Sequence, residues 1–131
     1  MLRVVVIAAF VLHGLAHLSG FFASWTTNTS GFTDRPWILS GNVTLNSGLG
    51  RVFGLLWLVV TLCSVGAGIG LALQQPWWPV LAIAQAAVSL IVIVPWWNTV
   101  VPGSKVGAAF DVIVMVALFL PWREGLIEAL R

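Results

Sequence analysis

Both histidines of the chain, His13 and His17, lie in the middle of one long apolar run. Residues four apart on an α-helix point to the same side, so a helix through this run carries two imidazoles on one face. Imidazole transfers protons near neutral pH and is also a frequent metal ligand. An ionisable side chain within a membrane span is costly and usually faces a bundle interior or a wet cavity. We therefore expect this pair to mark a functional site.

One carboxylate, Asp111, lies in another apolar run and can join the two imidazoles. A carboxylate beside an imidazole at low dielectric holds its tautomer and tunes its proton transfer, which predicts acid–base catalysis by His13, His17 and Asp111. Two alternatives stay open. The same three residues could hold zinc or non-haem iron, although we expect no cofactor because no further ligand completes the set. The polar groups could also only hydrogen-bond across helices and hold them together.

The composition is that of an integral membrane protein. Of 131 residues, 60% are hydrophobic and only 8% are charged, with a mean hydropathy of +1.03, whereas soluble domains average roughly a quarter charged residues. The basic residues are scattered and give a net charge of only +2, which argues against a nucleic-acid partner. The one cysteine, Cys63, excludes an internal disulfide bond.

The hydropathy pattern predicts a single all-α domain over residues 1–131, an antiparallel four-helix transmembrane bundle. A long polar loop at residues 24–47 separates the first two helices, with a short hairpin around Ser40-Gly41-Asn42, and residues 124–131 form a short interfacial helix. Tryptophans at both ends of the spans predict an aromatic belt that leaves only Trp57 inside. The four spans are expected at about residues 3–23, 48–73, 77–96 and 104–121.

The helical rise of about 1.5 Å per residue places the polar residues at similar depths. Counted from the end nearest the long loop, His13 and Gln85 lie roughly 15 Å deep, His17 and Asp111 roughly 10 Å deep, and Arg51 within about 5 Å. We therefore expect a polar pocket in this half of the bundle, although Gln85 could be only an interhelical contact and Arg51 could extend to headgroups. The expected substrate-binding residues are Arg51, Gln85, Asn98, Trp57 and Trp97, with Lys105 at the mouth.

Two segments and the tryptophan-flanked third and fourth spans carry a resemblance to a known group. The segments are residues 13–21 (HGLAHLSGF) and residues 51–58 (RVFGLLWL). Over most of its length the chain resembles small bacterial four-helix membrane proteins of the DoxX-like kind. The resemblance implies an up-and-down bundle in a bacterial plasma membrane, and some members of that group are associated with quinone or redox systems.

Together these features predict a membrane-embedded pocket that binds a lipophilic small molecule and performs acid–base chemistry on it, of the isomerase, cyclase or hydrolase type. Small residues along every span are typical of close helix packing and also predict a homo-oligomer surrounded by membrane lipid. We expect cytoplasmic termini, because a long Thr- and Asn-rich loop is easily translocated. The alternatives are a non-catalytic accessory or assembly subunit of a membrane complex, and a metal or proton conduit.

Overall fold

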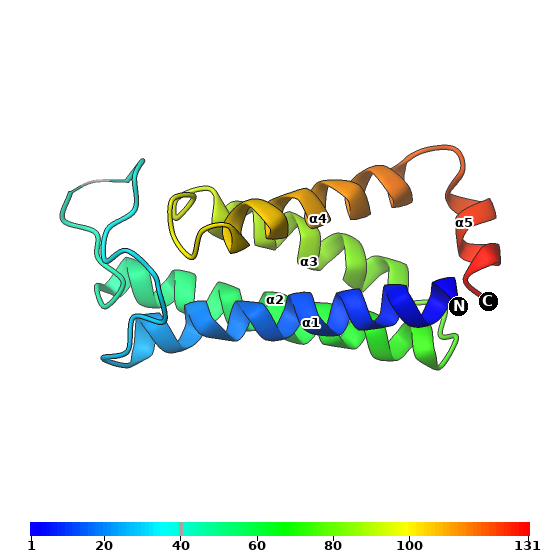
Figure 1. The fold of residues 1–131 in the computed structure, drawn as a ribbon, viewed down its shortest axis with the longest axis horizontal. Helices are drawn as coiled ribbons and strands as arrows, with labels where there is room; N and C mark the ends of the chain where they lie inside the picture. The colour runs from blue at the N-terminus through cyan, green and yellow to red at the C-terminus, as the bar shows by residue number, and fades with distance from the viewer. Residues whose placement is uncertain (40) are drawn as a thin grey trace.

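The structure is a computed structural model that describes residues 1–39 and 41–131. This part of the chain is all-helical and contains no β-strand. Four longer helices are followed by a short one that folds back across their ends (Figure 1). The helices are α1 (Leu2–Trp25), α2 (Gly48–Ala72), α3 (Trp78–Ile93), α4 (Gly103–Phe119) and α5 (Arg123–Ala129).

Two helices, α1 and α2, are each long and apolar enough to cross a membrane. Helix α4 qualifies only when α5 is added to it, across a bend of 106°. Helix α3 is apolar but has 16 residues and ends at Ile93, earlier than the predicted limit at residue 96. The early end has a local cause: Val94 keeps helical angles, but Pro95 has no backbone N–H with which to continue the helical hydrogen bonds.

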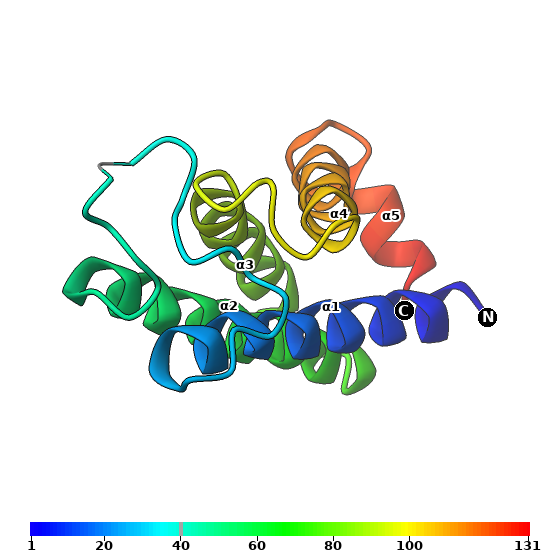
Figure 2. The ribbon, with the colours of Figure 1, turned by 60° about the vertical axis from the view of Figure 1, so that its left-hand side comes forward.

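Each of the first four helices packs against the next along the chain. Both termini lie at one end of the molecule and the long loop lies at the other (Figures 1 and 2). Helices α1 and α2 approach closely at Gly14, where the Thr61 hydroxyl donates to the Gly14 carbonyl at 2.9 Å. The Ser64 hydroxyl donates to the Phe10 carbonyl at 2.8 Å. The small residues predicted to face a neighbouring helix do so here.

Helix α5 closes the end of the molecule that carries the termini. Leu130 is buried and belongs to the same apolar core as Phe10 and Leu118. The Arg3 guanidinium donates hydrogen bonds to the carbonyls of Ala72 and Arg131, at 2.6 and 3.1 Å. The predicted helix in residues 124–131 is therefore present and tied to the ends of α1 and α2.

The hairpin predicted in the long loop is wrong. Residues 37–39 and 43–45 form no strands, and Ser40 in the predicted turn lies outside the described residues. The backbone groups bond elsewhere, since Trp37 N donates to the Pro95 carbonyl and Leu45 N to the Asp34 carbonyl. Leu45 is 1% exposed, so the loop instead anchors a side chain in the core.

Trp57 is buried as expected, but the interfacial position predicted for Trp96 is wrong. The chain turns at Pro95 and places the Trp96 indole 5.4 Å from the Trp57 ring, with Phe53 beside both. Trp78, also expected at an interface, is 5% exposed and packs edge-on against Phe10. Packing the large Trp78 and Trp96 rings against other apolar side chains stabilises the fold more than an interfacial position of these rings would.

Candidate functional site

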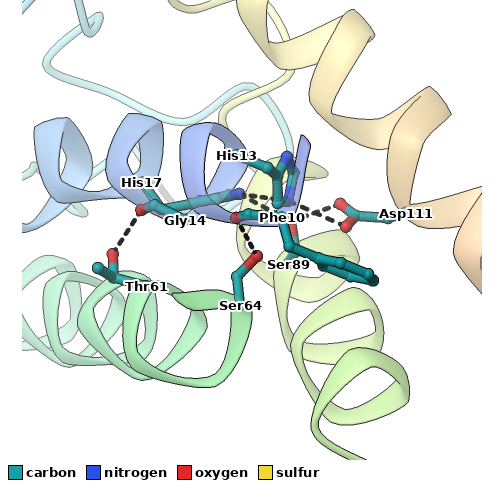
Figure 3. A network of polar contacts seen from close by, with 8 residues as sticks. All are labelled: Phe10, His13, Gly14, His17, Thr61, Ser64, Ser89 and Asp111. Carbon is teal, nitrogen blue, oxygen red and sulfur yellow. Dashed lines mark hydrogen bonds and ion pairs between the residues drawn. The ribbon is translucent and has the colours of Figure 1, made fainter. Parts of the chain in front are cut away.

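Four side chains from α1, α3 and α4 meet in a closed ring of polar contacts (Figure 3). His13 Nε2 lies 3.1 Å from Asp111 Oδ1 and 3.2 Å from His17 Nε2. His17 Nε2 lies 3.0 Å from Ser89 Oγ, and the Ser89 hydroxyl donates to Asp111 Oδ2. We call His13, His17, Ser89 and Asp111 the polar ring. The predicted meeting of the two imidazoles with Asp111 is thus observed, while their catalytic role stays a prediction.

The packing of α1 determines which way the histidines face. Gly14 lies against α2, and a β-carbon there would come 3.0 Å from Ser64 Cβ, so a side chain at this position would push the neighbouring atoms of α2 away by a few tenths of an ångström. His13 and His17 flank that contact and point toward α3 and α4 (Figure 3). Ser89 and Asp111 are fully buried, and His17 is 8% exposed. Helices α1, α3 and α4 therefore hold four largely buried polar side chains together.

A cavity of about 380 Å³ adjoins the polar ring and lies between α1 and α4. We call it the α1/α4 cavity. It reaches His13 and His17 but not Asp111 or Ser89. Phe32 of the long loop lines it, which places it in the half of the molecule that the sequence predicted. The remaining lining residues are mostly apolar or small: Ala9, Leu12, Ala16, Ser19, Trp57, Ile93, Trp96, Thr99, Val100, Gly103, Ser104, Val106, Gly107 and Phe110.

Arg51, predicted to bind a substrate at the mouth of the pocket, does not line the α1/α4 cavity. Arg51 is exposed, and its guanidinium lies 5.5 Å from the centroid of the Trp25 ring instead of at the cavity mouth. The cause is the rotation of α2, whose inner face is taken by Gly54 and Trp57. Trp57 does line the cavity, as predicted.

The connection between α3 and α4 also differs from the prediction. Asn98 and Lys105 are exposed, and neither lines the cavity. Trp97 is half-buried and outside the cavity, with its carbonyl accepting a hydrogen bond from Ser104. Trp96 occupies the inward position instead, because the turn at Pro95 points the first of the two indoles toward the core.

Gln85 is fully buried, as its predicted depth required, but it does not line the cavity. Its amide has no hydrogen-bond partner among the described residues. Ser89, one helical turn further along α3, takes the place expected of Gln85 in the polar ring. Sequence reasoning missed Ser89: its spacing of four from Gln85 indicates the same face of the helix, but not that its hydroxyl donates a hydrogen bond there.

The arrangement divides the polar ring into two pairs. His13 and His17 border the α1/α4 cavity and can touch a molecule in it, whereas Asp111 and Ser89 lie behind them. Asp111 and Ser89 can therefore act on such a molecule only through the histidines, and the orienting role expected of Asp111 stays a prediction. Asp111 Oδ1 lies within ion-pair distance of His13 Nε2 but accepts no hydrogen bond of good geometry from the described residues.

No family profile, curated protein or solved structure matches the chain. The class of the protein is therefore defined by its own features. It is all-helical in the part that the structure describes, with two helices long and apolar enough to span a membrane.

Proposed function

We propose that the chain is an integral membrane protein with four antiparallel transmembrane helices that binds a lipophilic small molecule in the α1/α4 cavity and performs acid–base chemistry on it. The observation that carries this proposal is an apolar cavity of about 380 Å³ with two imidazoles on its wall. Ligand pockets are typically apolar, with a few polar groups that orient the ligand, and have volumes of roughly 300–1,000 Å³.

The outer surface of the helices supports the membrane position. Large apolar side chains are more than half exposed along all four long helices, among them Leu12, Leu62, Ile91 and Ile113. A soluble protein rarely exposes contiguous apolar area of this extent. Lipid tails would cover these side chains. An apolar surface that is unfavourable in water is therefore favourable in a bilayer.

The position of the cavity supports access from the bilayer. Its two sides are formed by α1 and α4, which are not among the extensively packed helix pairs. Leu12 on α1 and Val106 on α4 flank it and are 66% and 64% exposed. A molecule dissolved among lipid tails would meet these apolar side chains first and could reach His13 without crossing water.

The charges around the cavity favour a neutral ligand. Among the described residues no Lys or Arg lines it, because Arg51 and Lys105 point elsewhere. A phosphate or carboxylate would therefore lack a cationic partner inside. Imidazole nitrogens donate to or accept from a carbonyl or hydroxyl group, so we infer a lipophile that carries a neutral oxygen function.

Acid–base chemistry follows from the order of the side chains in the polar ring. An imidazole of the cavity wall would exchange a proton with the ligand, and the Asp111 carboxylate behind His13 would stabilise the imidazolium that forms. The Ser89 hydroxyl holds the carboxylate from its other oxygen. Positioned proton transfer contributes typically about 10²–10⁴-fold to a rate.

Native mass spectrometry and solvent extraction of the protein purified in mild detergent test the proposal. A β-carbon on Gly107 would lie 3.3 Å from Ile93 Cδ1 and 3.7 Å from His13 Cε1, so Gly107→Leu should fill the cavity. We expect a lipophile to co-purify with the wild type and to be lost from Gly107→Leu. Ala109→Leu, on the exposed side of the same helix, is the matched control. Equal ligand content in all three proteins would contradict the proposal.

A further inference from the structure

We propose that His13, His17 and Asp111 bind one divalent first-row transition-metal ion, zinc or iron(II), with open coordination positions turned toward the α1/α4 cavity. The inference names a cofactor for the site described above. Its purpose rests on the proposed function, whereas occupancy by the ion can be measured without any lipophile.

The first argument is a count of hydrogens in the polar ring. Each Nε2 atom has one position in its ring plane, which holds either a hydrogen or a lone pair. His13 Nε2 nevertheless lies within 3.2 Å of both Asp111 Oδ1 and His17 Nε2. His17 Nε2 lies equally close to His13 Nε2 and Ser89 Oγ. With one position on each imidazole, no assignment of hydrogens satisfies all of these contacts.

A cation resolves the two contacts of His13 Nε2, those with Asp111 Oδ1 and with His17 Nε2. When an ion lies among the two Nε2 atoms and Asp111 Oδ1, each atom points a lone pair at it and needs no hydrogen from its neighbours. The same ion would partner Oδ1, which is buried and accepts no hydrogen bond within the described residues. The crowding of acceptors and the unpaired oxygen therefore have one common explanation.

The spacing of the three atoms agrees with a coordination shell. Bonds of about 2.0–2.1 Å arranged tetrahedrally around zinc place neighbouring ligand atoms about 3.3 Å apart. The observed edges are 3.2 Å between the imidazoles and 3.1 Å from His13 to Asp111. One possible ligand atom of each residue lies within 4.8 Å of the other two, so the third edge exceeds the tetrahedral spacing by no more than about 1.5 Å.

The residue types and their supports also fit. Two histidines and one carboxylate form the ligand set of several zinc hydrolases and of non-haem iron(II) sites with open positions. Histidines at i and i+4 present both nitrogens from one helix. Ser89 donates to Asp111 Oδ2 and so leaves Oδ1 directed at the site, as outer partners of metal ligands usually do.

An ion at this place changes the chemistry in one respect. Its bonds would use the Nε2 lone pairs, so the imidazoles of the loaded protein would be ligands, and the proton exchange proposed above would pass from them to a water molecule at the open position of the ion. The ion would also polarise a carbonyl oxygen that reaches its open position from the cavity. This agrees with a neutral, oxygen-containing ligand.

Elemental analysis of the full chain tests the inference. The protein is purified in mild detergent with an affinity tag that contains no histidine, and zinc and iron are measured by plasma mass spectrometry. We expect about one ion per chain in the wild type and none in His17→Ala or in Asp111→Asn, which keeps the shape of the side chain. Ser64→Ala is the matched control, because it removes a buried hydroxyl that bonds α1 outside the polar ring and should keep the ion.

A second measurement keeps the test independent of the folding of the variants. Wild-type protein is stripped with a chelator, checked for helix content by circular dichroism, and titrated with cobalt(II). We expect visible cobalt absorption that saturates at about one equivalent, and an affinity about 10–100-fold weaker in Ser89→Ala. A folded, stripped wild type that takes up no cobalt would overturn the inference, and so would equal metal content in the wild type and Asp111→Asn.

The two proposals fail separately. If the protein binds no metal but a lipophile still co-purifies with the wild type and not with Gly107→Leu, the metal site is overturned and the ligand pocket stands. One ion per chain without any cavity ligand would overturn the proposed function and leave the metal site.

Discussion

Gly20 on α1 lies so close to the indole of Trp57 on α2 that a β-carbon on the glycine would overlap the ring. This contact determines the shape of the cavity, because Trp57 is one of its walls and is 2% exposed. Trp57 in turn packs against Phe32 and Trp96, which join it to the long loop and to the turn after α3. Because Gly20 has no side chain, the Trp57 ring can lie against α1 and still contact both the long loop and the turn after α3.

Gly20→Ala should destabilise the protein by about 1–3 kcal/mol, as expected when a methyl group is forced into a packed interior. The measurement is reversible unfolding in detergent, followed by tryptophan fluorescence. Gly48→Ala is the control, since nothing lies within 4 Å of a β-carbon at that position. Equal stability of the two variants would mean that the Trp57 ring moves freely, contrary to its burial.

The two hydroxyls that join α2 to α1 should each contribute a little. Thr61→Val and Ser64→Ala remove donors to the carbonyls of Gly14 and Phe10, and each should cost about 0.6 kcal/mol, the average for interhelical hydrogen bonds in membrane proteins. Leu62→Ala, on an exposed face of α2, serves as comparison in the same unfolding assay. A cost above several kcal/mol would indicate that the hydroxyls do more than hold the two helices together.

Arg3→Ala should loosen α5. The variant loses two hydrogen bonds from a charged donor, to Ala72 and Arg131, and bonds of this kind are worth about 1.5–3 kcal/mol. Hydrogen exchange measured by mass spectrometry should become faster in residues 123–131 and stay unchanged in α2. Arg123→Ala is the matched control, because Arg123 is exposed and, among the described residues, its ion pair is with its neighbour Glu124, at 3.7 Å. Unchanged exchange in α5 would show that the packing of Leu130 and the hydrogen bond from Gln74 Nε2 to the Arg131 carbonyl anchor it without Arg3.

Gln85→Leu should be neutral or stabilising, by up to about 1–3 kcal/mol. The amide is fully buried without a partner among the described residues, and leucine of similar size avoids the cost of desolvating it. Ligand and metal content should not change, since Gln85 does not line the cavity. A clear loss of stability or of ligand would assign the amide a partner and restore the role expected from its depth.

The sequence predicted the helices well because their apolar runs are long and uninterrupted. The predicted limits of the second and fourth spans, residues 48–73 and 104–121, agree closely with those of α2 and α4. The meeting of His13, His17 and Asp111 followed from their depth in such helices, which needs only the rise per residue. The length of an apolar run and the depth of a residue within it depend on one helix alone, so both can be predicted from the sequence without knowing how the helices pack.

The predictions failed where the outcome depended on rotation of a helix or on the path of a loop. Arg51 and Asn98 were expected at the mouth of the pocket, but the first faces Trp25 and the second is exposed. Trp96 and Trp97 are adjacent in sequence, and only the turn at Pro95 decides which of them points inward. Ser89 was hidden among small packing residues, because a serine on such a stripe gives the same pattern whether it packs or donates a hydrogen bond.

The unequal length of the helices has a consequence for the surrounding lipid. Helix α1 has 24 residues and extends about 36 Å, whereas the 16 residues of α3 extend about 24 Å, less than the roughly 30 Å of a hydrocarbon layer. A bilayer adapts to such a mismatch by tilting the longer element and thinning beside the shorter one. The bilayer would thus be thinner beside α3 and α4, where the headgroups would lie closer to the membrane centre.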